Sequence, residues 1–468
     1  MPEIFLLAAT CLILVIDLFL TERTRLLTYG LSLAALIGAI ALVQNAAGPT
    51  TEIILDGAFI RDPMSDVLKT GLLLVTLFGF VYAKDYLIEQ GTFRGEYYVL
   101  GLFAVLGMLV MISANNFLTV YLGLELLALC LYALVAFHRD SKTGAEAAMK
   151  YFVLGALASG MLLYGISMIY GATGQLSFPE VAAVIDSGQA DQTVLVFGLV
   201  FVVIGVSFKF GAVPFHMWVP DVYHGAPTAV TLFLGSAPKI AAFALAIRLL
   251  VDGMGGLLAQ WQDMLIILAV LSMALGNVIA IAQTNIKRML AYSTISHVGF
   301  IFLGLLAGTE EGYGAAMFYA IVYALMAAGG FGVLTMISHK GLDAENIHDL
   351  KGLNDRSPWL AFMMMLVLFS MAGVPPTVGF FAKLFVLDAV ISVDMVWLAI
   401  VAVFFSIIGA FYYLRAVKVM YFDKPIDDAP LVSSMDTQVI VSINGLAMLG
   451  FGLFPAALLG ACRAAFSG

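Results

Sequence analysis

Apolar residues fill almost the whole chain in runs of about 20, separated by short polar connections. A helix of about 20 apolar residues crosses the hydrocarbon core of a membrane, so each run predicts one span. The pattern predicts fourteen spans: 4–20, 26–44, 65–83, 97–113, 116–137, 146–170, 193–215, 227–251, 263–283, 289–307, 313–338, 358–392, 395–420 and 437–460. The expected fold class is an all-α polytopic membrane protein.

Two blocks of five spans resemble each other. Spans four to eight and spans nine to thirteen have similar lengths, and prolines such as Pro214 and Pro376 interrupt the fourth span of each block. Because five is odd, the second block enters the membrane from the opposite face, as in transporters with inverted repeats. The expected parts are three N-terminal spans (1–96), a first repeat (97–251), a second repeat (252–420) and a C-terminal span (421–468).

Composition excludes a soluble enzyme, because 62% of the residues are hydrophobic and only 11% are charged. A net charge of -9 does not indicate a nucleic-acid partner. The three cysteines lie far apart and form no metal-binding or disulfide pattern.

The distribution of the 22 Lys and Arg residues predicts the orientation. Fourteen of them fall in the loops after odd-numbered spans, whereas Arg61 and Arg463 fall on the other side. Cytoplasmic loops are enriched in such residues. We therefore expect both termini on the outer side of the membrane, away from the cytoplasm.

Six cations fall within predicted spans: Lys69, Lys150, Lys209, Lys239, Arg248 and Lys383. An ionised side chain at the bilayer centre costs about 3 kcal/mol, so each requires a reason. Five of the six are lysine, which can lose its proton, whereas arginine cannot. We interpret Lys69 and Arg248 as anchors whose charged ends reach the interface. Lys150 is either such an anchor or a place of proton uptake.

The strongest candidates for proton transfer are Lys209, Lys239 and Lys383, because each lies deep in a span close to a proline. We predict that Lys383 is the second-block counterpart of Lys209. Glu125, in the middle of span five, supplies a carboxylate. His297 stands among hydroxyl residues and titrates near neutral pH. The alternative is structural: anchors of the broken helices, or hydrogen bonds between helices.

Other motifs are absent from the sequence. It contains no phosphate-binding loop, nucleophile elbow or flavin fingerprint, so energy must come from another subunit. His216 and His224 flank Asp221 in an expected cytoplasmic loop, but without the spacing of metal ligands.

Three segments carry a family resemblance: Phe208 to Thr228, Lys239 itself, and Asn285 to Gly299. They resemble the antiporter-like proton-channel subunits of proton-pumping NADH:quinone oxidoreductase, respiratory complex I, over about the whole chain. Among the L, M and N types of bacteria, the chain is most similar to the N-type. Relatives of this family include subunits of cation/proton antiporters and of membrane-bound hydrogenases.

The resemblance implies a role for each site residue. It implies that Glu125 pairs with Lys209 and that Lys239 is the central relay. It also implies that His297 continues the polar axis and that Lys383 is the outer release lysine.

The resemblance also implies partners and a further residue. Lys150 matches another lysine of the family. No cofactor is expected in this chain, since NADH, FMN, iron–sulfur clusters and quinone are implied for other subunits. The expected neighbour is the M-type subunit. Two alternatives remain: a membrane subunit of an antiporter or hydrogenase, and a purely structural spacer.

Overall fold

The computed structural model describes residues 1–21, 24–339, 343–425, 431 and 433–467. Arg23 and Lys340, which contribute to the predicted orientation, lie outside these described residues.

The N-terminal part is helical apart from one small hairpin. Its elements are α1 (Pro2–Asp17), α2 (Leu26–Ala46), β1 (Glu52–Ile54), β2 (Phe59–Arg61) and α3 (Pro63–Glu89). The strands are antiparallel, with Glu52 opposite Arg61 and Ile54 opposite Phe59. The all-α expectation did not include this hairpin, whose tight turn contains an Asp-Gly pair that favours positive φ angles.

The first repeat and the connection that follows it contain eight α-helices and two short turns. They are α4 (Gly95–Ser113), α5 (Phe117–Val135), α6 (Lys142–Thr173), α7 (Phe178–Asp186), α8 (Gln192–Phe210), α9 (Trp218–Gly225), α10 (Thr228–Gly235), α11 (Ala237–Ala246), a π-helical turn η1 (Ile247–Asp252) and a 3-10 turn η2 (Gly255–Leu257). Residues 218–225 were expected to form a loop. They form α9 instead, which is the second half of an interrupted span.

The remaining elements form the second repeat and the C-terminal span. They are α12 (Leu258–Ala282), α13 (Ile286–Leu306), α14 (Glu310–Ile337), a 3-10 turn η3 (Ile347–Leu350), α15 (Leu353–Arg356), α16 (Pro358–Ala372), α17 (Val378–Ser392), α18 (Val396–Phe422), α19 (Met435–Leu453) and α20 (Pro455–Ala464). Pro455 divides the last expected span into α19 and α20.

The structure confirms the fold class. In the described residues, 12 helices are long and apolar enough to cross a membrane. Helix α1 and the interrupted pair α16–α17 supply the other two expected crossings. Both interrupted spans break at a glycine in the left-handed conformation, Gly211 (φ +77°) and Gly373 (φ +84°). A cis peptide bond follows each, at Val213–Pro214 and Pro375–Pro376.

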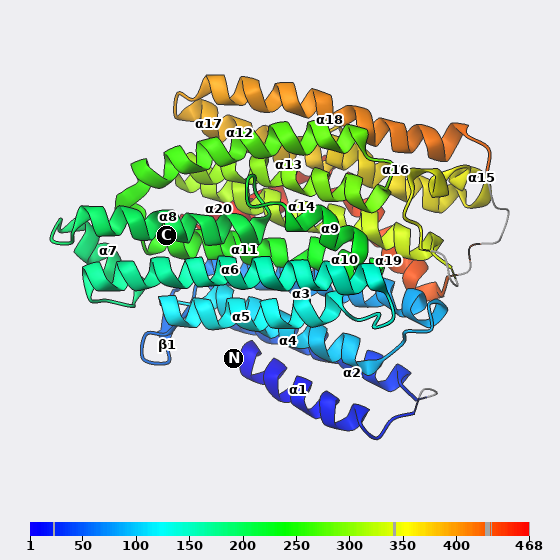
Figure 1. Ribbon diagram of the computed structural model, residues 1–468, viewed down its shortest axis with the longest axis horizontal. Coiled ribbons are helices and arrows are strands. Elements are labelled where there is room, and N and C mark those ends of the chain that lie inside the picture. Colours follow the sequence, from blue (N-terminus) through cyan, green and yellow to red (C-terminus); the bar gives the residue numbers. More distant parts are fainter. Residues whose placement is uncertain (22–23, 340–342, 426–430, 432, 468) are drawn as a thin grey trace.

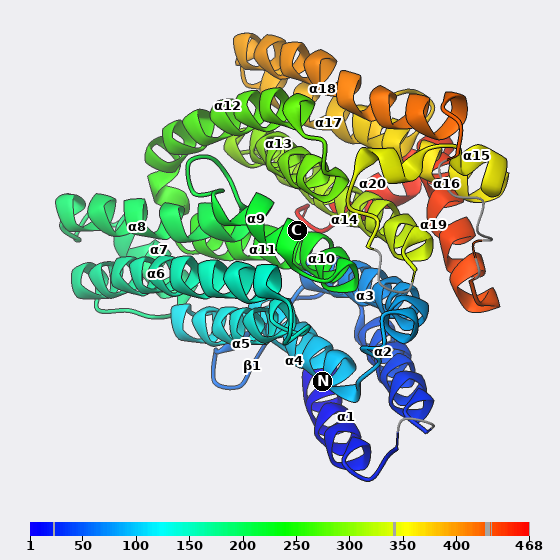
Figure 2. The same cartoon turned by 45° about the vertical axis from the view of Figure 1, so that its right-hand side comes forward.

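The helices run roughly side by side, with α1 and α18 at opposite edges of the bundle (Figures 1 and 2). The most enclosed segments are α10–α11, α13 and α14. In each of them, 94% of the most apolar 18-residue stretch is buried, compared with 33% in α18. These central helices are apolar on all sides, as expected for buried helices. They also carry Lys239 and His297, so the fold places those residues in its interior.

One end of the bundle gathers the connections that hold most of the Lys and Arg residues. Helices α1, α3, α5, α12, α14 and α18 all finish there, and α15 lies at this end in Figure 1. Hydrogen bonds join the connections, for example from the Gln90 side chain to the His339 carbonyl and from the Ile286 amide to the Glu345 carbonyl. We call this the basic end, and its counterpart the opposite end.

Close contact between α4 and α5 depends on two glycines. A Cβ atom placed on Gly123 would lie 2.7 Å from the Gly107 carbonyl oxygen and 2.9 Å from the Met111 amide nitrogen. Both are backbone atoms, so a side chain can fit only if the helices separate. Small residues allow such approach between membrane helices.

We expect Gly123→Ala to lower the thermal unfolding midpoint of the protein in its assembled complex, because overpacking costs about 1–3 kcal/mol. The control is Gly160→Ala on α6, where no atom lies within 4 Å of the new Cβ. Differential scanning calorimetry of the two purified variants provides the comparison. Equal midpoints would contradict this role for Gly123.

Candidate functional site

The first helix break positions Lys239. Helix α8 ends at Phe210, and the Lys239 ammonium donates a hydrogen bond of 2.8 Å to the Phe210 carbonyl oxygen. The last carbonyls of a helix have no intrahelical donor and carry the negative end of its dipole. Lys239, which is 1% exposed, therefore satisfies a carbonyl that the break leaves unpaired. Its ammonium also lies 5.6 Å from the centre of the Trp218 ring.

The second break repeats this contact with Lys383. The Lys383 ammonium donates to the carbonyl oxygen of Ala372, the last residue of α16, at 2.9 Å, and to the Ser406 hydroxyl at 2.9 Å. It lies 5.1 Å from the centre of the Phe300 ring. Phe210 and Ala372 each precede the left-handed glycine of their break. The two lysines thus occupy equivalent positions relative to the two helix ends.

This equivalence corrects one prediction. Lys383 was expected to be the counterpart of Lys209, but Lys209 lies before its break, on α8, whereas Lys383 lies after its break, on α17. Lys239 makes the matching contact although it comes from α11. Distance along the chain could not show this, because the matching contact comes from a neighbouring helix.

Glu125 and Lys209 do not form an ion pair in the described residues. Glu125 is the charge that acts on the Lys209 ammonium, but no N···O contact of 4.0 Å or less joins them in the described residues. One oxygen of Glu125 is buried and has no hydrogen-bond partner. The same is true of the nearby Tyr132 hydroxyl and of the Ser207 hydroxyl on α8. Buried polar groups in this condition are typical sites for internal water.

Aromatic rings connect this region to Lys239. Tyr132 on α5 packs edge-on against Tyr151 at 4.8 Å, and Tyr151 stacks on Trp218 at 4.7 Å between ring centres. The Trp218 indole donates to the Phe208 carbonyl at 3.1 Å. Since Trp218 also contacts the Lys239 ammonium, the rings form a continuous wall from the Glu125 region to the first break.

His297 is the centre of a buried cluster of hydroxyl groups. Its Nδ1 lies 2.7 Å from the Tyr319 hydroxyl and its Nε2 lies 3.1 Å from the Tyr413 hydroxyl. Tyr413 in turn contacts Ser293 at 2.5 Å, and Tyr323 donates to Thr294 at 2.7 Å. With a hydroxyl on each ring nitrogen, His297 can accept a proton on one side and release one on the other.

Phe300 connects this cluster to the second break. Its ring is parallel to that of Tyr319, with centres 6.0 Å apart, and its face is turned toward the Lys383 ammonium. The charge of Lys383 acts on His297. On the other side of α13, Phe302 packs against Phe210 at 5.1 Å, next to the carbonyl that accepts from Lys239. Helix α13 therefore lies between the two breaks.

Lys150 lies apart from these residues, at the basic end. Its side chain is 44% exposed and pairs with Glu146 at 2.9 Å and with Asp221 at 2.8 Å. Asp221 also pairs with Arg288 at 2.7 Å. The structure thus does not bring Lys150 into contact with the two breaks.

The prediction that Arg248 and Lys69 are interfacial anchors is wrong. Both are buried in ion pairs, and Lys69 contacts Glu3 of α1 at 2.6 Å. Arg248 contacts both Asp62 oxygens, at 2.8 and 2.9 Å, and Asp252 at 2.9 Å, and donates to the Ile112 carbonyl at 3.0 Å. These acids come from distant parts of the chain, so hydropathy could not reveal the pairs.

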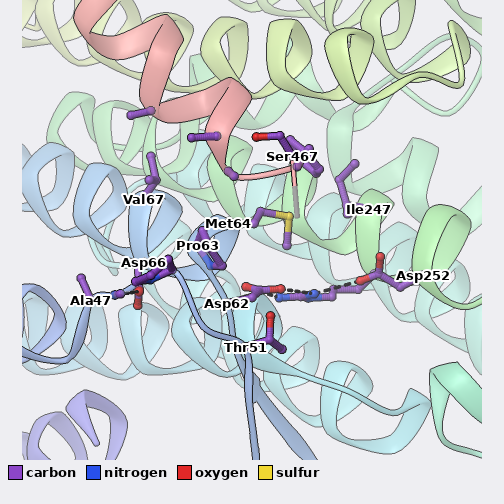
Figure 3. Close-up of a pocket in the computed structure, with 17 residues that line it drawn as sticks. Ala47, Thr51, Asp62, Pro63, Met64, Asp66, Val67, Ile247, Asp252 and Ser467 are labelled. Carbon is purple, nitrogen blue, oxygen red and sulfur yellow. Dashed lines mark hydrogen bonds and ion pairs between the residues drawn. The ribbon is translucent and has the colours of Figure 1, made fainter.

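Arg248 also borders a cavity of about 670 Å³ at the opposite end of the bundle. Asp62 and Asp252 line the same cavity, and the Arg248 side chain lies between them and pairs with both (Figure 3). Burial disfavours the charged form of Asp62, but the adjacent Arg248 charge and its hydrogen bonds hold the pKa of that carboxyl below its usual value. With every donor group of its guanidinium in contact with an acceptor, Arg248 acts as a clip between α3, α4 and η1.

We expect Arg248→Met to destabilise the protein strongly, by about 3–5 kcal/mol, because it leaves the largely buried Asp62 carboxylate, and that of Asp252, without their partner. The control is Lys418→Met, whose pair with Asp423 spans 3.5 Å at a side chain that is 66% exposed. Chemical unfolding of the two variants in detergent measures the difference. Equal stability of both variants would show that the Arg248 clip carries no net energy.

Sequence reasoning missed the partners of His297 and the acceptors of the lysines. Tyr319 and Tyr323 are one helical turn apart on α14, a spacing that places both on one face and could have suggested a shared role. Ser406 and the two carbonyl oxygens gave no sequence signal, because their roles depend on tertiary contacts.

Two inverted helix breaks, each with a lysine hydrogen-bonded to the helix end, and a histidine cluster between them, define the class of antiporter-like membrane subunits. Residues 114–409 match the family described as NADH:quinone oxidoreductase/Mrp antiporter, TM. The chain is 61% identical over 467 residues to NADH-quinone oxidoreductase subunit N of Thioalkalivibrio sulfidiphilus, covering 100% of this chain and 97% of the relative. It is 59% identical over 462 residues to the same subunit of Thiobacillus denitrificans, covering 99% and 96%.

Solved structures agree with these relatives. A chain of respiratory complex I from Thermus thermophilus superposes with a TM-score of 0.86 at 30% identity, covering 99% of this chain and 100% of that one. A chain of the Mrp complex from Dietzia sp. DQ12-45-1b shares the fold, with a TM-score of 0.85 at 22% identity and coverage of 99% and 95%. The chain belongs to the NADH-quinone oxidoreductase subunit N family.

Proposed function

We propose that this chain is the N-type proton-translocating membrane subunit of NADH:quinone oxidoreductase and that Lys239, His297 and Lys383 transfer the protons. The observation that carries the proposal is the pair of lysines, each hydrogen-bonded to the end of a broken helix, with the His297 cluster between them. Redox chemistry elsewhere in the complex supplies the energy.

The environment of each lysine favours a change of protonation. Burial disfavours the ammonium, and the carbonyl at the helix end favours it. A charge-assisted hydrogen bond contributes about 1.5–3 kcal/mol, which is close to the cost of about 3 kcal/mol for placing a cation in the membrane. Because the two effects nearly offset each other, a small change of nearby charge can decide whether the lysine holds its proton.

Glu125 and Lys209 supply such a change of charge. When the pair closes, the Lys209 ammonium is neutralised; when it opens, a cation remains close to the first break. The unpartnered oxygen of Glu125 and the lack of an ion pair in the described residues fit the open arrangement. The neighbouring subunit would drive the change, and the expected neighbour is the M-type subunit.

His297 joins the two lysines in this scheme. A proton released by Lys239 reaches the imidazole through hydroxyl groups and water, and His297 passes one from its other nitrogen toward Lys383. Lys383 then releases the proton toward the opposite end.

The remaining assignments follow from the family and the loop charges. The basic end faces the cytoplasm of a bacterium, so both termini lie on the periplasmic side. The chain takes no part in electron transfer itself, and NADH, FMN, iron–sulfur clusters and quinone bind to other subunits. Lys150 remains a candidate for proton uptake from the cytoplasm.

We expect Lys239→Met and Lys383→Met to lower the number of protons pumped per NADH oxidised by the assembled enzyme. Methionine fits the space of lysine but carries no proton. Acidification of inverted membrane vesicles, measured together with NADH oxidation, gives the ratio. Wild-type ratios in both variants, at normal subunit content, would contradict the relay and favour a structural spacer.

A cation/proton antiporter is the second candidate, favoured by the shared fold of the Mrp chain. Purification under native conditions separates the two proposals. Redox subunits that co-purify support complex I, whereas sodium-dependent proton exchange by a complex without redox subunits supports the antiporter.

A further inference from the structure

A second polar region lies at the basic end, away from both helix breaks. A cavity of about 440 Å³ opens there between the end of α3, the connection before α6, and residues 343–349. Three acids line it, Asp343, Glu345 and Asp349, together with His138. The two repeats meet at this cavity, because Ala226 and Pro227 of the first repeat also contribute to its wall.

Lys287 lies directly behind the wall of the cavity. It is the second residue of α13, at the basic end, where a long side chain would normally extend into water. Instead it is 1% exposed. Its ammonium donates to the Ala226 carbonyl at 2.8 Å and lies 3.7 Å from a Glu345 oxygen. The sequence counted Lys287 among the loop cations of this end, whereas in the structure it belongs to α13 and is buried.

The contacts of Lys287 do not satisfy its charge. An ammonium has three N–H donors, and the described residues offer Lys287 one carbonyl at hydrogen-bond distance and one looser carboxylate. The carboxylate is itself shared, since His224 lies 3.5 Å from the other oxygen of Glu345. The hydrogen bond from His224, helped by the Lys287 charge, holds the pKa of Glu345 below its usual range. Glu345 therefore stays ionised near neutral pH.

Helix α13 leads from Lys287 to the His297 cluster. Thr294 follows Lys287 by seven residues, which corresponds to a rise of about 10.5 Å along the helix axis and a rotation that differs from two full turns by about 20°. The side chains of Lys287 and Thr294 therefore lie on nearly the same face of α13. Thr294 accepts the hydrogen bond of Tyr323, whose ring lies 5.0 Å from that of His297. A proton at Lys287 is thus two helical turns from the cluster.

Polar groups without partners lie beside this interval. Tyr86 donates to Asp343 at 3.0 Å and accepts from the Thr228 amide at 3.1 Å. The Thr228 hydroxyl, deeper in the protein, is buried and has no partner in the described residues. In the described residues, the buried Tyr223 hydroxyl has no hydrogen-bond partner either. Hydroxyl groups of this kind can hold bridging water between the cavity and the cluster.

We propose that Lys287 is the proton-uptake residue of this subunit, which receives protons from the acid-lined cavity and passes them along α13 to the His297 cluster. The inference rests on the proposed proton-translocating function. In each cycle the Lys287 ammonium releases one proton inward, and the neutral amine takes one proton from water in the cavity. The contact with Ala226 persists in both forms, because an amine still donates to a carbonyl.

Two substitutions separate this role from a structural one. Lys287→Arg keeps the positive charge and can still contact the Ala226 carbonyl, but arginine does not release a proton. We expect both Lys287→Arg and Lys287→Met to lower the protons pumped per NADH by the same amount as Lys239→Met in inverted vesicles. Lys351→Met, at the same end but outside the cavity, is the control and should pump as the wild type does.

Each outcome decides the assignment. Wild-type pumping in Lys287→Arg with loss in Lys287→Met identifies Lys287 as a structural clip and overturns the proposal. Wild-type pumping in both Lys287 variants also overturns the proposal for Lys287. If Lys239→Met loses pumping in the same experiment, the proposed proton-translocating function still stands. If neither Lys287 variant assembles, Glu345→Gln takes their place, because it keeps Lys287 and its bond to Ala226. Slower proton uptake in Glu345→Gln supports the proposal, and wild-type uptake rejects it.

Discussion

A helix that ends inside a membrane leaves carbonyl groups that no lipid can satisfy, and this constraint organises the whole structure. Among the described residues, helices α8 and α16 end in this way, at Phe210 and at Ala372, and each end receives a lysine from another segment. The cost of an unpaired carbonyl and the cost of a buried cation are both several kcal/mol. When the lysine ammonium donates a hydrogen bond to the carbonyl oxygen, the contact offsets part of both costs. The breaks therefore explain why lysines are tolerated in the interior, and the lysines explain why the breaks persist.

The central helices follow from the same constraint. A broken helix needs protein on all sides, since its exposed backbone cannot face lipid. Helices α10–α11, α13 and α14 provide that surrounding and are almost completely buried. As a result His297 lies in a closed environment, in which its two ring nitrogens contact the hydroxyl groups of Tyr319 and Tyr413. The aromatic wall from Tyr132 to Trp218 has the corresponding position beside the first break.

Hydropathy predicted the spans well because the membrane imposes a length and a composition on every crossing. The same reasoning identified Lys239, His297 and Lys383 as interior polar residues, since proline and depth are visible in the sequence. It failed for Arg248, Lys69 and Lys287, which lie near the ends of helices. There, hydropathy cannot distinguish a side chain that reaches water from one that meets a distant acid such as Asp62 or Glu3. It also missed the β1–β2 hairpin, whose short strands lie within a polar connection.

The acceptors of Lys239 and Lys383 are main-chain oxygens, and this has an evolutionary consequence. Phe210 and Ala372 differ greatly in size, yet each presents the same atom at the same place in its break. A substitution at either position leaves the acceptor in place, so point mutation cannot delete it as it can delete a carboxylate. Half of each lysine–carbonyl contact is thus inherited with the backbone, and in that contact only the lysine side chain can be lost by substitution.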